Sequence, residues 1–194
     1  MTPEALAALW RERRPAGPPV AHTFRTAYPD RWVRFHSLPE SKRHPATEAE
    51  YAIVLDRYNT VLDALFAGGD VLVVTMDWSS TPDGPAGRPS PRRELHPGGV
   101  RWWTESDLDD PDPEFHTHTR LYADRRGWER GCVDALLRAV ADEALVEVFL
   151  TDPDLRRIHH PYDGGADVVL TTSAERDALR SRHSAWLSTH PSGC

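Results

Sequence analysis

Amine and amide side chains are almost absent from this sequence of 194 residues. It has one lysine (Lys42), one asparagine (Asn59) and no glutamine, so 22 of its 23 basic residues are arginine. Schiff-base, pyridoxal-phosphate and phosphate-loop chemistries each need a placed lysine, and the sequence around Lys42 matches none of them. Asparagine and glutamine commonly read adenine edges, and the net charge of −7 opposes a phosphate backbone. Lysine chemistry is therefore excluded, and we expect no nucleic-acid partner.

Cysteine and long apolar runs are also scarce. Cys132 and Cys194 are the two cysteines, which is too few for a disulfide framework or a cysteine-based zinc site. No stretch approaches the roughly 18 apolar residues of a membrane span, and the first residues lack the pattern of a signal peptide. We therefore expect a soluble cytoplasmic protein that does not bind membranes. Its arginine-rich, alanine-rich composition is typical of a bacterial protein from a GC-rich genome.

The length fits one domain, and hydrophobic periodicity divides the chain into helices and strands. Thr2 can cap a short helix in residues 1–22, which we interpret as an N-terminal helical extension. Thr47 with Glu50 forms a capping box, and apolar residues then recur at helical spacing as far as Gly68. Two further helices are predicted, over 128–140 and from Thr172 onward. Strands are predicted at 31–36, 71–76, 100–104, 115–123, 145–150, 156–160 and 166–170.

Several of these strands follow one another through turns too short for a crossover, which requires antiparallel pairing. The sequence therefore predicts a single α+β domain over 23–190, with a mainly antiparallel sheet and helices packed on one face. Two long loops interrupt it. Residues 79–99 are rich in proline and glycine, and residues 105–114 are strongly acidic.

Several short motifs lie in the two halves of the chain: Ile158 to Leu170 (IHHPYDGGADVVL), Trp186-Leu187, Arg34-Phe35, Leu65-Phe66 and Asp70. Together they resemble the bacterial family called domain of unknown function 3885. The resemblance spans roughly residues 30 to 188 and implies the family's fold and a bacterial cytosolic setting, but no activity. Where the family pattern has Tyr-Asp-Asp-Arg-Gly, this chain has Tyr162 to Ala166 as Tyr-Asp-Gly-Gly-Ala.

A histidine-based metal site is one candidate for function. His116 and His118 fall on one face of a predicted strand, about 7 Å apart at Cα, which is close enough to share one ion. His159, His160 or Asp163 could supply a third ligand. With ten histidines in the chain, such pairs also arise without a metal, so surface or core-edge histidines are the alternative.

The segment 161–167 supports two interpretations. Gly164 and Gly165 permit positive φ, and Asp163 can hydrogen-bond its own backbone, which favours a simple hairpin turn. Alternatively, Tyr162, Asp163 and Asp167 form a polar pocket or a divalent-ion site.

The acidic loop is a candidate binding surface. Six acids lie in ten residues, and such a patch steers association with a basic partner. The residues of this candidate surface are Glu105, Asp107, Asp109, Asp110, Asp112, Trp103 and Tyr162. A loop kept solvated by its charge is the alternative. Since acids outnumber the arginines and flank them, we expect the arginines to be ion-pairing surface residues.

Two hypotheses for function follow. The first is a non-catalytic protein-binding module, immunity-like or regulatory, without a cofactor and with a basic protein as partner. The second is a histidine-dependent metalloenzyme that holds a divalent metal such as zinc at His116 and His118 with His159, His160 or Asp163. No Gly-x-Ser-x-Gly elbow is present for nucleophilic catalysis.

Overall fold

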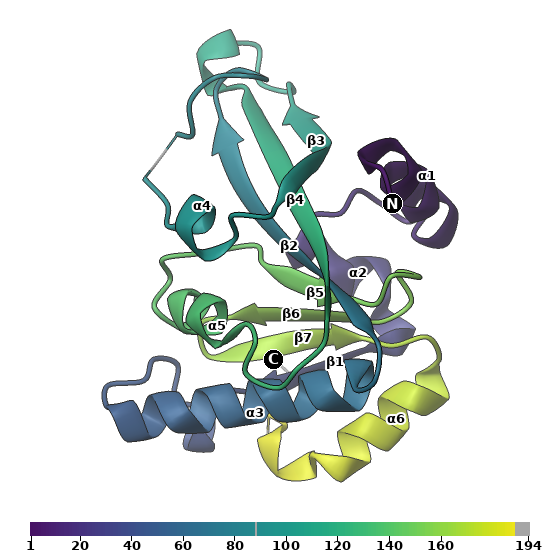
Figure 1. The fold of residues 1–194 in the computed structure, drawn as a ribbon, viewed down its shortest axis with the longest axis vertical. Helices are drawn as coiled ribbons and strands as arrows, with labels where there is room; N and C mark the ends of the chain where they lie inside the picture. Colours follow the sequence, from purple (N-terminus) through teal and green to yellow (C-terminus); the bar gives the residue numbers. More distant parts are fainter. Residues whose placement is uncertain (88, 189–194) are drawn as a thin grey trace.

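The computed structural model describes residues 1–87 and 89–188 and confirms a single-domain α+β fold (Figure 1). Seven strands form one antiparallel sheet in the order β1-β7-β6-β5-β2-β4-β3. The strands are β1 (Trp32–His36), β2 (Asp70–Ser79), β3 (Val100–Asp107), β4 (Thr117–Gly127), β5 (Phe149–Thr151), β6 (Ile158–Tyr162) and β7 (Gly165–Val169). The helices are α1 (Pro3–Arg13), α2 (Phe24–Ala27), α3 (Glu48–Phe66), α4 (Arg92–Leu95), α5 (Asp134–Ala141) and α6 (Ser173–Arg182).

The larger core lies between one face of the sheet and the helices α3, α5 and α6. Thr47 caps α3 as predicted, because its Oγ1 accepts from the Glu50 backbone N–H at 3.3 Å, while the Glu50 carboxylate accepts from the Ala46 backbone N–H at 2.6 Å. Helix α3 then buries Val54, Leu62 and Leu65 against the sheet. Full burial of one such side chain contributes roughly 1.5–3 kcal/mol, so this face supplies much of the stability.

A second core covers the opposite face of the sheet. Trp10 of α1, Phe24 of α2 and Phe149 of β5 meet there, with ring centroids 5.3–5.9 Å apart. The expectation that helices pack on one face therefore holds for α3, α5 and α6, whereas α1 and α2 pack on the other. The physical reason is that β2 presents apolar side chains on both faces, with Val71 and Val73 in the larger core and Leu72 and Val74 in the second core.

Two predicted elements differ from the structure. The helix expected from Trp128 begins at Asp134, and Cys132, within the range of the expected helix, is an exposed free thiol that precedes α5. The segment 79–99, expected to be one long loop, contains α4 and buries Arg92 and His96. Residues 88, 189 and 190, which belong to the predicted loop and domain, lie outside the described residues.

The acidic segment is divided between a strand and a connection. Glu105 and Asp107 belong to β3, and the remaining acids lie in the connection to β4. In Figure 1 this connection stands at the end of an arm that β2, β3 and β4 form beyond the rest of the sheet. Among residues 1–87 and 89–188, no helix is both long enough and apolar enough to cross a membrane.

Candidate functional site

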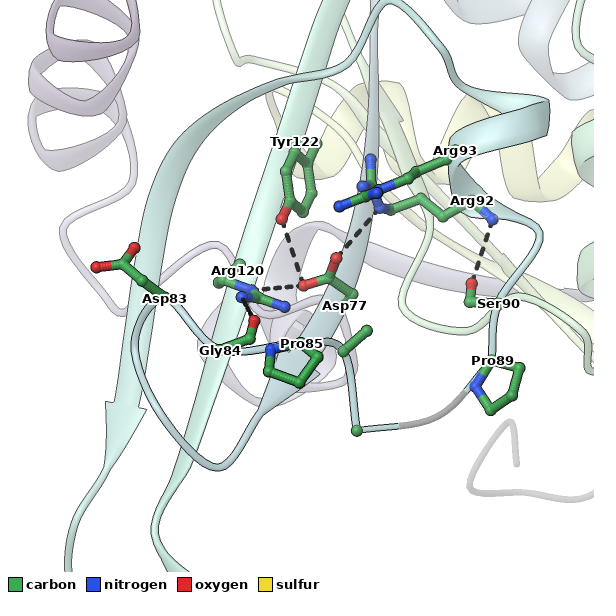
Figure 2. A pocket seen from close by; sticks show the side chains of 12 residues that line it. Asp77, Asp83, Gly84, Pro85, Pro89, Ser90, Arg92, Arg93, Arg120 and Tyr122 are labelled. Carbon is green, nitrogen blue, oxygen red and sulfur yellow. Dashed lines mark hydrogen bonds and ion pairs between the residues drawn. The ribbon is translucent and has the colours of Figure 1, made fainter.

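A cavity of about 560 Å³ lies on the arm formed by β2, β3 and β4, under the segment that connects β2 to β3. Asp77 of β2 pairs with Arg120 of β4, and Thr75 pairs with Tyr122, so these four side chains share one face of the two strands. Segment 79–99 folds over this face and brings Arg92 of α4 to it (Figure 2). We call the cavity lined by Asp77, Arg92, Arg93, Arg120 and Tyr122 the arginine pocket.

A single buried carboxylate holds two buried arginines in this pocket. Arg120 Nε donates to Asp77 Oδ1 at 2.6 Å, and Arg92 Nε lies 3.4 Å from Asp77 Oδ2. All three side chains are less than a tenth exposed. Burying charge is costly unless it is paired, and here one negative charge faces two positive ones. The pocket therefore carries an excess positive charge inside a protein of net charge −7.

The guanidinium groups are fixed, yet some of their donors stay open. Arg120 Nη1 donates to the Gly84 carbonyl at 2.6 Å, and the Arg92 guanidinium stacks on the Tyr122 ring at 3.6 Å from its centroid. Among the described residues, no hydrogen-bond partner is found for the Arg92 Nη atoms or for the exposed Arg93. Since rigid, unpaired N–H donors are what an anion needs, this arrangement suits a negatively charged ligand.

Tyr122 forms the wall on which Arg92 stacks. Its hydroxyl donates to Asp77 Oδ1 at 3.4 Å. Burial, followed by the nearby Asp77 carboxylate, raises the pKa of Tyr122 above its ordinary value. The phenol therefore stays protonated at neutral pH and remains a donor to Asp77.

Behind the arginine pocket, His96 anchors the segment that carries Arg92. Its Nδ1 lies 2.8 Å from Thr75 Oγ1, and its Nε2 lies 3.1 Å from Asp124 Oδ1. Burial lowers the pKa of His96, and Asp124 opposes this shift only in part. Because the His96 side chain is fully buried, it has no access to a ligand in the cavity. We therefore assign it a positioning role rather than a catalytic one.

The structure separates the histidines of the predicted metal site. His118 pairs with Ser79 of β2, whereas His159 pairs with Leu150 of β5, which in turn pairs with Val73 of β2. Six residues along β2 and three strand spacings lie between them, which amounts to more than about 20 Å. The proposed site at these histidines is therefore wrong, because residues at the two positions cannot share an ion.

The other predicted ligands have separate environments. His160 follows His159 in β6 and therefore faces the opposite side of the sheet, where its Nδ1 lies 2.7 Å from the Val148 carbonyl. His116 precedes β4, and its Nε2 lies 2.8 Å from the Asp110 carbonyl. These contacts are local, and they explain both histidines without a metal.

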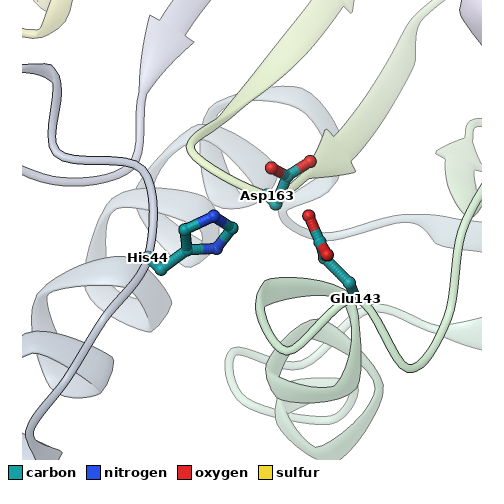
Figure 3. Close-up of side chains that lie close together, drawn as sticks. All are labelled: His44, Glu143 and Asp163. Carbon is teal, nitrogen blue, oxygen red and sulfur yellow. The ribbon is translucent and has the colours of Figure 1, made fainter.

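Asp163 alone among the predicted ligands joins a group with possible metal-ligand spacing. Figure 3 shows it at the turn between β6 and β7, facing His44 and Glu143. One ligand atom of each residue lies within 4.8 Å of the others. Among the described residues, this is the one group of three histidine or carboxylate side chains with such spacing. Arg43 pairs with both Asp163 and Glu143. An arginine thus already neutralises the carboxylates that an ion would need.

The predicted binding surface is not continuous either. Asp109, Asp110 and Asp112 are exposed at the end of the arm, whereas Tyr162 lies in β6, with three strands between it and β3. The indole of Trp103 donates to Glu105 at 2.9 Å and lies under Arg11 of α1. Tyr162 therefore does not belong to the surface that the acids form, whereas Trp103 contacts Glu105 among those acids.

The expectation that the arginines are ion-pairing surface residues is wrong for the buried ones. Arg92 and Arg120 line the pocket, and buried Arg14 donates to the carbonyls of Leu155 and Arg156 at 2.8 and 2.6 Å. The alternation that places His116 and His118 on one face of the strand predicted at 115–123 places Arg120 and Tyr122 on the same face, and this was the available signal. Arg92 lies in a segment without hydrophobic periodicity, so its burial could not be predicted from the sequence.

Fold and cavity together define a one-sheet α+β domain with an arginine-lined pocket on a projecting arm. The chain belongs to the family described as "Domain of unknown function (DUF3885)", whose family model matches residues 20–191. The resemblance seen in the sequence is thereby confirmed. No curated protein and no solved structure matches the chain.

Proposed function

We propose that this protein is a non-catalytic binding module that holds an anionic ligand in the arginine pocket. One observation carries the proposal: two buried arginines share a single buried carboxylate and border a cavity of about 560 Å³. Ligand pockets are typically 300–1,000 Å³, so the volume suits a small molecule. A bound anion would neutralise the excess charge that the fold places there.

The residues around the cavity support binding rather than catalysis. The Asp77 carboxylate is occupied by its ion pairs with Arg120 and Arg92, and the His96 side chain is fully buried beneath the pocket, so neither is available to a ligand as a general base. Among the described lining residues, none is a histidine or a cysteine. The proposed function uses no cofactor.

Isothermal titration with small anions tests this proposal. Arg92→Gln removes the guanidinium with open donors, and we expect it to weaken anion binding by about tenfold or more, as for loss of a charged hydrogen bond. Arg125→Gln is the matched control, because Arg125 lies on β4, the strand that carries Arg120, but is exposed and pairs with Asp70 at 2.6 Å. Equal binding by both variants and the wild type would disprove the pocket as the site.

A second candidate function, immunity-like or regulatory, is recognition of a basic protein partner by the end of the arm. A specific observation supports it: exposed acids at 107, 109, 110 and 112 are flanked by Leu108 and Phe115, which are 53% and 67% exposed. Apolar side chains ringed by charge are typical of protein interfaces. In line with its composition and family, we propose a bacterial, cytoplasmic setting for either function.

A charge-neutralised arm tests this second candidate. We expect the wild type to bind polylysine with an affinity that falls as salt increases. Replacing Asp109, Asp110 and Asp112 with Asn should abolish that binding, whereas Asp30→Asn, Asp56→Asn and Asp154→Asn, at exposed acids elsewhere, should not. Equal binding by the two triple variants would rule out the arm as the interface.

A further inference from the structure

The balance of charge in the arginine pocket indicates how many negative charges its ligand carries. Arg92 and Arg120 against Asp77 leave one positive charge, and the exposed Arg93 adds a second. Asp83 does not offset these charges, because it is 81% exposed and pairs with Arg101 at 2.7 Å. Among the lining residues that the structure describes, two positive charges are therefore unneutralised, which a dianion would balance.

The open donors around the pocket also come from several directions. Arg92 lies on the Tyr122 ring, and Arg120 is held between Asp77 and the Gly84 carbonyl. Ser90 Oγ accepts from the Arg92 backbone N–H at 3.2 Å, so its own hydroxyl hydrogen is free to donate. Donors from separate segments suit a tetrahedral group with three terminal oxygens better than a flat carboxylate, which one arginine fork can satisfy.

The cavity is larger than an inorganic anion needs. Beyond the arginines, the described part of its rim includes Pro85, Ala86, Gly87 and Pro89, which offer carbon surface. An added Cβ at Gly87 would lie 2.4 Å from the Trp78 ring, so this part of the rim packs closely on an aromatic side chain. An organic group attached to the anion would contact this rim.

We propose that the ligand of the arginine pocket is a phosphomonoester of a small organic molecule. This inference rests on the proposed function and narrows it: the phosphate, a dianion at neutral pH, contacts Arg92, Arg93 and Arg120, and the organic part lies along the proline-rich rim. The second ionisation of a phosphomonoester has a pKa of about 6. Binding should therefore weaken as the pH falls below 6 and the ligand becomes a monoanion.

Titration with three ligands that share one ring tests the inference. Phenyl phosphate is a tetrahedral dianion, phenyl sulfate a tetrahedral monoanion and benzoate a planar monoanion. At pH 7.5 we expect phenyl phosphate to bind about tenfold more tightly than either monoanion, which is the effect of one additional charged contact. At pH 5 the preference over phenyl sulfate should largely disappear.

Arg93→Gln is the decisive variant, because Arg93 is exposed and its replacement does not threaten folding. We expect it to weaken the binding of phenyl phosphate more than that of phenyl sulfate and so to reduce the preference for the dianion, and Arg125→Gln to change neither affinity. If all three ligands bind equally to the wild type, anion binding stands and the phosphomonoester inference is wrong. If none binds, the proposed function fails as well.

Discussion

His159 provides a test of how burial controls the stability of this fold. The residue lies in β6, fully buried, with its ring 5.7 Å from that of Tyr58, and neither ring nitrogen has a partner among the described residues. Burial, helped by the neighbouring His160, lowers the pKa of His159 to about 3. In the unfolded chain the pKa returns to about 6.5. Between these values the unfolded state binds more protons than the folded state, so stability falls as the pH falls below 6.5.

The linkage relation gives the size of this effect. For a single group with these two pKa values, the loss of unfolding free energy between pH 7 and pH 4 is about 3 kcal/mol. Urea denaturation at both pH values measures it. His159→Phe keeps a ring beside Tyr58 and removes the titrating group, so we expect it to lose about 3 kcal/mol less than the wild type over this range.

The control for this experiment is His44→Asn, because His44 is exposed. This variant should retain the pH dependence of the wild type. At pH 7, His159→Phe should unfold within about 1 kcal/mol of the wild type, since it removes a buried polar group that has no partner. A pH dependence for His159→Phe as steep as that of the wild type would refute the assignment of acid sensitivity to this residue.

Three further changes probe the pocket, the core and a turn. Asp77→Asn should lower the free energy of unfolding, measured in urea, by about 3 kcal/mol, because Arg92 and Arg120 lose their counter-ion. Added inorganic phosphate should raise the melting temperature of this variant more than that of the wild type. An unchanged stability would contradict the buried pairing. Leu62→Ala should cost about 2–5 kcal/mol in the same assay, since Leu62 is fully buried on α3, and a loss below 1 kcal/mol would disagree with that packing. Gly164→Ala should cost about 1 kcal/mol or more, because φ is +82° there, and a stability equal to that of the wild type would argue against the turn.

Much of the fold could be predicted because hydrophobic periodicity and capping residues are local signals. Thr47, Gly68 and Thr172 marked helix ends that the structure confirms. The order of the strands could not be predicted, because it depends on which apolar faces meet after the chain has folded. The sequence pattern also gave no indication that β1 and β7, far apart in the chain, are neighbours in the sheet.

The candidate site was harder to predict than the fold. Alternation along a strand predicts from the sequence that His116 and His118 share a face. A metal ion also needs ligands from other segments, and their distance depends on the order of the strands in the sheet. The pocket depends on Asp77, Arg92 and Arg120, which are far apart in the sequence. Their spacing matches no motif that would predict that they meet. Only burial distinguishes Arg92 and Arg120 from the many arginines on the surface.

The position of β1 at the edge of the sheet has a consequence for how the chain folds. Trp32 pairs with Val169 and His36 with Gly165, so the first strand bonds only to the last one. The pairing closes a loop of more than 120 residues, and contacts of such long range form slowly because the chain entropy must be lost first. On the ribosome, β1 and the apolar residues behind it must wait for β7 to be synthesised. Until then they are exposed, and we expect this interval to be when the protein most needs protection from aggregation.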